Sequence, residues 1–265
     1  MDHRLPAVLL LVAALAAGCS FTLPRDLVQL DDLDTCPRMT VDELAARAAG
    51  FDSRTDTHTL RCALGTLREA SAAPVHRTAA GAHICLLLAE RTDDATRRER
   101  YAAEGVRWAE IALEEGAVND GAVHYYLALN LGLAVREHAT LAAKNMKRIE
   151  SELLEARRLA PHLDEGGPLR TLGTLYLVAP AWPEGIGDGE KALALLKQAV
   201  NRFPQHPLNH IFYAQALWDL EQEDAKDTVQ QSLAHARRLI ELGDWGQVEK
   251  TWLHEYRQVA DEIGK

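Results

Sequence analysis

The amino-acid sequence predicts an all-α protein in which antiparallel helix pairs stack as a short superhelix of about ten or eleven helices. Apolar residues recur at spacings of three and four along most of the chain, and strand-like alternation rarely runs for long. Ala, Leu, Glu, Arg and Gln fill these periodic segments, whereas Gly and Pro fall between them, as helix formation and helix termination require. A repeated pattern of small and large residues at fixed positions is the third indication.

The periodic segments give the positions of the expected helices. We expect helices near residues 41–50, 57–71, 75–91, 95–115, 121–138, 141–160, 167–178, 189–202, 208–220, 226–242 and 246–262. Together they form one helical repeat domain over residues 41–265.

The repeat is clearest over residues 172–204. A tetratricopeptide pattern needs a small residue between two larger ones in its first helix, and these are Leu172, Gly173 and Tyr176. Its second helix needs two alanines around a large apolar residue and a proline at the end, which are Ala192, Leu196, Ala199 and Pro204. The small residues let two helices approach closely, and the proline ends the second helix. Similar copies over residues 127–161 and 207–236 predict several tetratricopeptide-like helix pairs.

The first residues have the composition of a bacterial export signal. Charged residues precede an apolar run from Leu5 to Ala17, which at about 13 residues is shorter than the roughly 20 that a membrane-spanning helix needs. The sequence then reaches Cys19 through small residues and resembles a lipobox, in which the cysteine receives a lipid. We expect residues 1–18 to be removed and residues 19–40 to form a lipidated tether at the periplasmic face of a membrane, more readily the outer than the inner one. The alternative is a plain secreted protein with an incidental cysteine.

Composition narrows the classes of function. Hydrophobic residues make up 47% of the chain, too many for a disordered protein. The net charge of −10 disfavours nucleic acid, because phosphate binding depends on a surplus of Lys and Arg. The sequence contains no HExxH or GxSxG motif, and its histidines show no spacing typical of a metal site. We therefore expect neither an enzyme, nor a cofactor, nor a metal centre.

Cysteines occur at positions 19, 36, 62 and 85, which leaves three if Cys19 carries lipid. Cys62 and Cys85 each lie 11 or 12 residues from a turn near Pro74, so they should stand at one level of a helical hairpin. At that level the Cα atoms can approach the roughly 5.5 Å that a disulfide needs. We expect a bridge between Cys62 and Cys85. The alternatives are two reduced cysteines packed as small apolar residues, or a bridge from Cys36 to either one.

Several segments resemble a known family. The matching segments include His124-Tyr125-Tyr126-Leu127-Ala128, Gly166-Gly167-Pro168-Leu169-Arg170, Leu172-Gly173, Trp182-Pro183 and Gly187-Asp188. Over residues 95–240 the chain is similar to the lipid-anchored tetratricopeptide T component associated with TRAP-type transporters. The resemblance implies a periplasmic accessory protein that associates with a solute-binding P component and handles a small hydrophobic or organic-acid ligand. A homo-oligomer is a further candidate assembly, and a general tetratricopeptide scaffold at the cell envelope is the alternative function.

We place the candidate ligand or partner site around an insertion at residues 179–188. This loop has seven residues more than an ordinary repeat turn, and long ordered loops are often functional. The helix before it carries a guanidinium suited to a ligand carboxylate. The candidate residues are Tyr126, Asn130, Arg170, Tyr176, Trp182 and Asp188. The alternative is structural: Arg170 pairs with Asp188 or with loop carbonyls, Trp182 covers the repeat core, and the remaining residues pack between helices.

Overall fold

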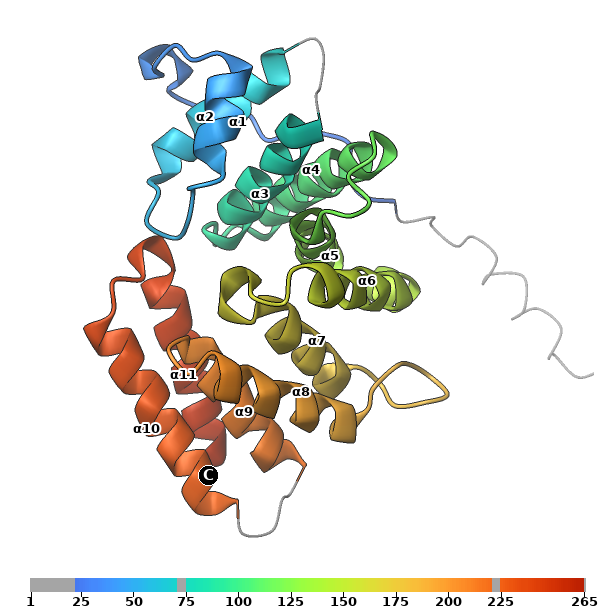
Figure 1. Ribbon diagram of the computed structural model, residues 1–265, viewed down its shortest axis with the longest axis vertical. Helices are drawn as coiled ribbons and strands as arrows, with labels where there is room; N and C mark the ends of the chain where they lie inside the picture. Colours follow the sequence, from blue (N-terminus) through green and yellow to red (C-terminus); the bar gives the residue numbers. More distant parts are fainter. Residues whose placement is uncertain (1–21, 71–74, 221–224, 265) are drawn as a thin grey trace, which may run out of the picture.

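The computed structural model describes residues 22–70, 75–220 and 225–264 (Figure 1). Within these ranges the chain forms eleven α-helices and three short 3-10 helices, and it has no strand beyond an isolated bridge between Ala181 and Gly187. The prediction of an all-α fold is confirmed. No helix in the described ranges is long and apolar enough to cross a membrane.

The helices lie close to the positions expected from the periodicity. Their bounds are α1 Val41–Ala48, α2 Thr57–Glu69, α3 Val75–Glu90, α4 Ala95–Glu114, α5 Gly121–Val135, α6 Ala139–Leu159, α7 Gly167–Val178, α8 Gly189–Arg202, α9 Pro207–Asp219, α10 Lys226–Leu242 and α11 Glu249–Ile263. The 3-10 helices are η1 Leu33–Thr35, η2 Leu163–Glu165 and η3 Gly246–Val248. The last expected helix is therefore split, because its first residues form η3.

Short polar side chains fix where many of these helices begin. Asp56, Asp94, Asp120 and Asp188 each precede a helix and accept a hydrogen bond from a backbone N–H of its first turn. These bonds satisfy amide groups that have no partner inside the helix. Thr40 does the same for α1 as part of a reciprocal capping box with Glu43.

Close approach between neighbouring helices depends on small residues. A Cβ atom added to Gly173 of α7 would lie 2.7 Å from Leu196 Cγ of α8, so only glycine permits this spacing. Gly105 of α4 is under the same constraint, because an added Cβ would lie 2.2 Å from the Asn130 Oδ1 atom of α5. Helices that follow each other in sequence pack in this way along the chain, and their apolar faces form three adjoining cores.

The stack of helices curves until its two ends meet. Figure 1 shows the red loop between α10 and α11 beside the blue loop between α1 and α2. The backbone N–H of Gln247 donates to the Ser53 carbonyl at 2.8 Å and joins the two loops. Gly246 lies next to this bond with φ of +58°, in the left-handed region that favours glycine. The contact closes the curve into a ring.

The segment before α1 packs on the helices, whereas we expected a polar tether. Val28 is 5% exposed and belongs to the N-terminal core. Its carbonyl accepts a bond from Arg68 at 2.9 Å, and the Pro24 carbonyl accepts one from Arg107 at 2.8 Å. The tether prediction is wrong for residues 22–40, because apolar residues within this segment reach the core. The export signal and Cys19 lie outside the described residues.

The disulfide differs from the expected one. Cys62 is bonded to Cys36, with a Cα separation of 5.4 Å, and Cys85 is a free, fully buried cysteine. The prediction of a bridge between Cys62 and Cys85 is wrong, because an equal distance from a turn fixes the level of two residues but not the direction of their Cβ atoms. The Cys85 side chain packs in the N-terminal core, while the bridge fastens the segment before α1 to α2.

Candidate functional site

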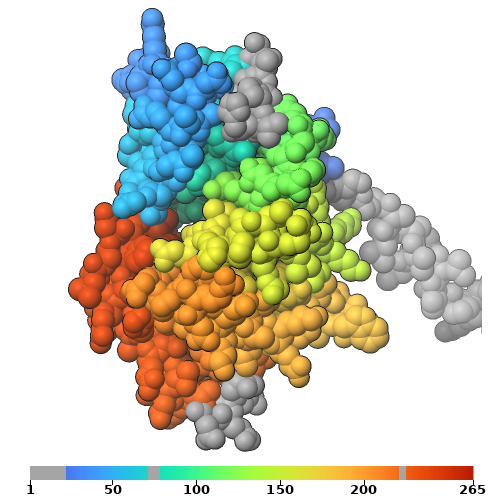
Figure 2. Space-filling view, in the orientation of Figure 1, coloured from blue at the N-terminus to red at the C-terminus, as the bar shows by residue number. Residues whose placement is uncertain are grey.

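A cavity of about 790 Å³ lies where the two ends of the ring meet. Its walls come from the loop between α1 and α2, from α3 and α5, from η2 and α7, and from α9, η3 and α11. Figure 2 shows the N-terminal part in blue and the C-terminal part in red in contact along one side of the molecule. The volume falls within the range of small-molecule sites in proteins, which runs from about 300 to 1,000 Å³.

A network of charged and polar groups centres on Asp164 in the cavity wall. Its carboxylate pairs with the buried Arg170 guanidinium and accepts a bond from the Tyr125 hydroxyl at 2.8 Å. Arg170 also donates to the Asn209 side chain at 2.9 Å. Burial alone would raise the pKa of Asp164, but the Arg170 charge and the bonds from Tyr125 and Arg170 lower it. The carboxylate therefore stays ionised, and the network holds η2, α5, α7 and α9 in fixed positions.

The local sequence explains how Asp164 reaches this position. Asp164 and Glu165 have φ of 49° and 45°, and Gly166 follows with φ of 87°. This run of left-handed residues turns the chain sharply after α6. Pro168 then lies in the first turn of α7, where its missing N–H costs no hydrogen bond. The turn brings the carboxylate of Asp164 back toward Arg170 in α7.

His206 is a buried, uncharged member of the same wall. Burial, reinforced by the Arg170 charge, lowers its pKa to about 3, so the imidazole is neutral at physiological pH. Its ring centroid lies 4.9 Å from that of Trp252 and 6.0 Å from that of Trp245. The two tryptophans come from the closing end of the ring, and together with His206 they form the C-terminal wall of the cavity.

Glu90 ends α3 and presents its carboxyl group to the cavity. Its side chain is exposed to solvent in the open cavity, although many protein atoms lie around the carboxyl group. Burial, together with the negative charge of Asp164, raises the pKa of Glu90 to about 7. Within the described part of the chain the carboxyl group has no hydrogen-bond or ion-pair partner, which distinguishes it from Asp164.

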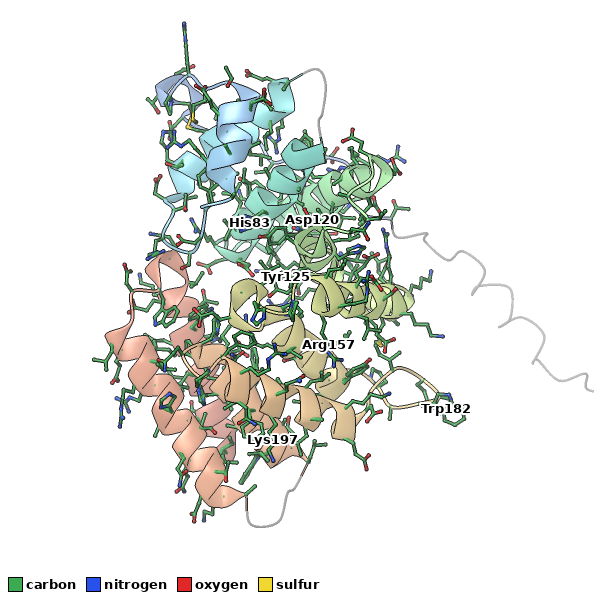
Figure 3. All side chains as sticks on the ribbon, in the orientation of Figure 1. His83, Asp120, Tyr125, Arg157, Trp182 and Lys197 are labelled. Carbon is green, nitrogen blue, oxygen red and sulfur yellow. A yellow bond between two sulfur atoms is a disulfide. The ribbon has the colours of Figure 1, made fainter. Side chains whose placement is uncertain are left out.

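Two stacked rings form the opposite wall. His83 of α3 and Tyr126 of α5 lie parallel, with centroids 4.4 Å apart and planes 5° from each other. Burial lowers the pKa of His83 to about 4, so this ring is also neutral. Figure 3 shows His83 and Tyr125 directed toward the space between the N-terminal and C-terminal helices.

No protein-family model matches the chain, and no curated protein matches it.

Two of the six candidate residues line this cavity. Tyr126 and Arg170 do so, and Arg170 is neutralised by Asp164 instead of standing free for a ligand. Asn130 is fully buried and donates to the Ala82 and Tyr126 carbonyls at 2.9 and 2.8 Å, so it joins helices.

The other three candidates lie around the end of α7. Tyr176 packs in the core and donates its hydroxyl to Glu150 at 2.6 Å. Asp188 caps α8 and pairs with Lys191 at 2.9 Å. Trp182 is 84% exposed and covers no core, and Figure 3 shows it at the tip of its loop, away from His83 and Tyr125. The structure thus separates the 179–188 loop from the cavity.

Sequence reasoning missed most of the cavity residues. Glu90, Asp164, His206 and Trp252 come from segments that are distant in sequence and meet only when the ring closes. The one usable signal was the Gly166-Gly167-Pro168 run, which marks the turn that carries Asp164.

Proposed function

We propose that this chain is a lipid-anchored accessory protein of the cell envelope that binds a small molecule in the ring cavity and docks on the solute-binding component of a TRAP-type transporter. The cavity is the observation that carries the proposal. It lies between the two ends of the stack of helices, and it combines aromatic walls with a few polar groups. Cavities of this size and composition are the usual form of a ligand site.

The state of the polar groups supports binding more than catalysis. Asp164, Arg170, Tyr125 and Asn209 satisfy one another, so the network is suited to holding the walls in place. A general acid or base must instead be free to reach a reacting atom. The Asp164 network is therefore given a structural role in this proposal.

The 179–188 loop is the proposed docking contact for the protein partner. Trp182 is 84% exposed and Val178, at the end of α7, is 65% exposed. Exposed aromatic residues of this kind often provide the central contacts of a protein interface. In this proposal the ligand and the partner protein use different parts of the molecule.

Mass spectrometry of the protein purified from its native membrane tests the ligand. We expect a small molecule to copurify with the wild type and to be absent after Leu129→Trp, which fills the cavity from α5. The matched control is Leu154→Trp on α6, where the side chain is 41% exposed and does not line the cavity. Equal retention by both variants would contradict the cavity as the binding site.

Two further measurements test the partner and the anchor. Trp182→Ala should weaken copurification of the solute-binding component without lowering the melting temperature.

For the anchor, Cys19→Ala should release the protein from the membrane fraction and abolish incorporation of labelled palmitate. A variant that stays membrane-bound, together with an unlabelled wild type, would overturn the lipoprotein part of the proposal.

A further inference from the structure

We propose that the cavity selects a ligand with a cationic ammonium group, held by Glu90 and by the aromatic walls. This inference rests on the proposed function, because it names the class of ligand for the same cavity. The proposed ligand has the opposite charge to the organic acid that the family resemblance implies.

The balance of charge in the cavity is the first argument. The described residues that line it include six carboxylates, namely Asp52, Glu90, Asp93, Asp164, Glu165 and Asp244, but only four arginines, namely Arg54, Arg98, Arg136 and Arg170. The potential of a cleft follows the surplus of one sign of charge on its walls. The cavity is therefore negative.

Each of the four arginines already has a carboxylate beside it. Arg54 pairs with Asp52, and Arg170 pairs with Asp164. Arg98 and Arg136 both approach Glu137, at 2.9 and 3.9 Å. An anionic ligand would have to compete with these carboxylates, and His83 and His206 are uncharged at neutral pH and offer no compensating positive charge.

A cationic ligand, in contrast, finds an unpaired group of opposite charge in the cavity. That group is Glu90. Its carboxyl group opens into the cavity, and no described residue bonds to it. An ammonium group placed there would neutralise the one carboxylate of α3 that faces Asp164 across the cavity. Binding would then relieve the repulsion between two negative groups.

The aromatic rings provide the second half of an ammonium site. Tyr126, Phe212, Trp245 and Trp252 line the same space as Glu90. The negative faces of such rings attract a cation, and sites for quaternary ammonium ligands combine several of them. The remaining apolar walls, including Leu87 and Leu133, would cover a short aliphatic chain.

Calorimetric titration with three probes of equal chain length tests the inference. The full chain carrying Cys19→Ala, which keeps the lipid out of the assay, is titrated at pH 8 with hexyltrimethylammonium, hexanoate and hexanol. We expect the ammonium probe to bind at least about tenfold more tightly than hexanoate, which corresponds to about 1.4 kcal/mol. Equal or tighter binding of hexanoate would overturn the inference.

Variants separate charge from shape. Glu90→Gln should weaken the ammonium probe about tenfold and leave hexanol within about twofold, since one charged contact contributes about 1.5–3 kcal/mol. Tyr126→Leu is the second variant and should weaken the ammonium probe more than hexanol. The matched control is Glu114→Gln, an exposed glutamate outside the cavity. An unchanged ammonium affinity in both cavity variants would refute the assignment.

The outcomes distinguish this inference from the proposed function. If hexanol binds, Leu129→Trp abolishes that binding, and no preference for the cation appears, the cavity is a ligand site but the ammonium assignment is wrong. If none of the three probes binds and no small molecule copurifies from the native membrane, both proposals are wrong.

Discussion

The cavity and the 179–188 loop show two ways in which this fold presents functional groups. The cavity wall is assembled from segments as far apart as Asp52 and Trp252, and buried polar bonds hold it in place. The loop is local, joins two consecutive helices, and carries at its tip a tryptophan that is 84% exposed. The first is suited to enclosing a small molecule, and the second is suited to touching another protein.

In this fold an unusual loop and the candidate ligand site do not coincide. The loop was visible in sequence because its Trp, Pro and Gly residues interrupt the repeat. The cavity was not, because each of its walls looks like an ordinary helix end until Gln247 meets Ser53.

The largest expected effect is at Arg170. Replacing it with Ala should lower the free energy of unfolding by about 3–5 kcal/mol, because the buried Arg170 side chain would leave a void, the buried Asn209 would lose its donor, and Asp164 would lose its counter-ion. Urea denaturation measures the change. Arg157→Ala is the control, since that side chain is exposed and should cost less than about 0.5 kcal/mol. Similar losses in both variants would mean that the network does not hold the cavity together.

The next effect concerns the bridge that fastens the segment before α1. Cys36→Ala should lower the free energy of unfolding by about 3 kcal/mol, because the bridge closes a loop with a sequence separation of 26. The double variant with Cys62→Ala should lose little more than the single one. Peptide mapping without reduction should yield a linked peptide of Cys36 and Cys62.

Burial raises the pKa of the free Cys85 thiol, so it should resist alkylation in the native protein. A linked Cys85 peptide would contradict the structure.

Most of the fold was predictable from sequence because it depends on local rules. Apolar spacing located the helices, and Asp188 and Pro207 lie where α8 and α9 begin. The repeat pattern also singled out Gly173, whose close contact with Leu196 the structure shows. These signals lie within one helix or between neighbouring helices, where the sequence distance is short.

The site was predictable only in part because it depends on contacts across the ring. Arg170 and Tyr126 were identified as candidates, but Arg170 pairs with Asp164, and not with a ligand carboxylate, with Asp188 or with loop carbonyls as the sequence suggested. The choice depends on the left-handed turn at residues 164–166, which periodicity does not describe. Glu90 gave no signal at all, since a glutamate at the end of a helix is normally solvated. Its position inside the cavity is set by the return of α11 toward α1.

A smaller effect, dependent on pH, should distinguish Glu90 from its neighbours. Its pKa is raised from 4.5 to about 7 in the folded chain, so its contribution to stability is present below pH 4.5 and is lost as the pH rises through 7. Relative to the wild type, Glu90→Gln should therefore gain stability between pH 5 and pH 8. Since the carboxyl group retains access to water, we expect a gain of about 1 kcal/mol.

The difference between variant and wild type is the quantity to measure, because other groups titrate nearby. The depressed pKa values of His83 and His206 act in the opposite direction and make the protein less stable as the pH falls below 6.5. The charged and titratable groups around the cavity are Asp52, Arg54, His83, Arg91, Asp93, Arg98, Arg136, Asp164, Glu165, Arg170, His206 and Asp244. Urea denaturation at pH 5, 6, 7 and 8 gives the difference, and Glu114→Gln should show none. A difference that does not vary with pH would mean that Glu90 titrates normally.

The smallest expected effect is at Trp182, and it completes the contrast between the two regions. Its side chain is 84% exposed, so Trp182→Ala removes little buried surface and should change the free energy of unfolding by less than about 0.5 kcal/mol. Trp252→Ala is the matched variant in the cavity wall, where the ring lies 4.9 Å from His206 and 5.0 Å from Trp245. Removing that ring should cost about 3 kcal/mol, because it leaves a void at the point where the ring of helices closes. Thermal and urea denaturation of both variants, side by side, measure the contrast. If Trp182→Ala were as destabilising as Trp252→Ala, the loop would belong to the packed structure, and it would be unavailable as a docking surface for a protein partner.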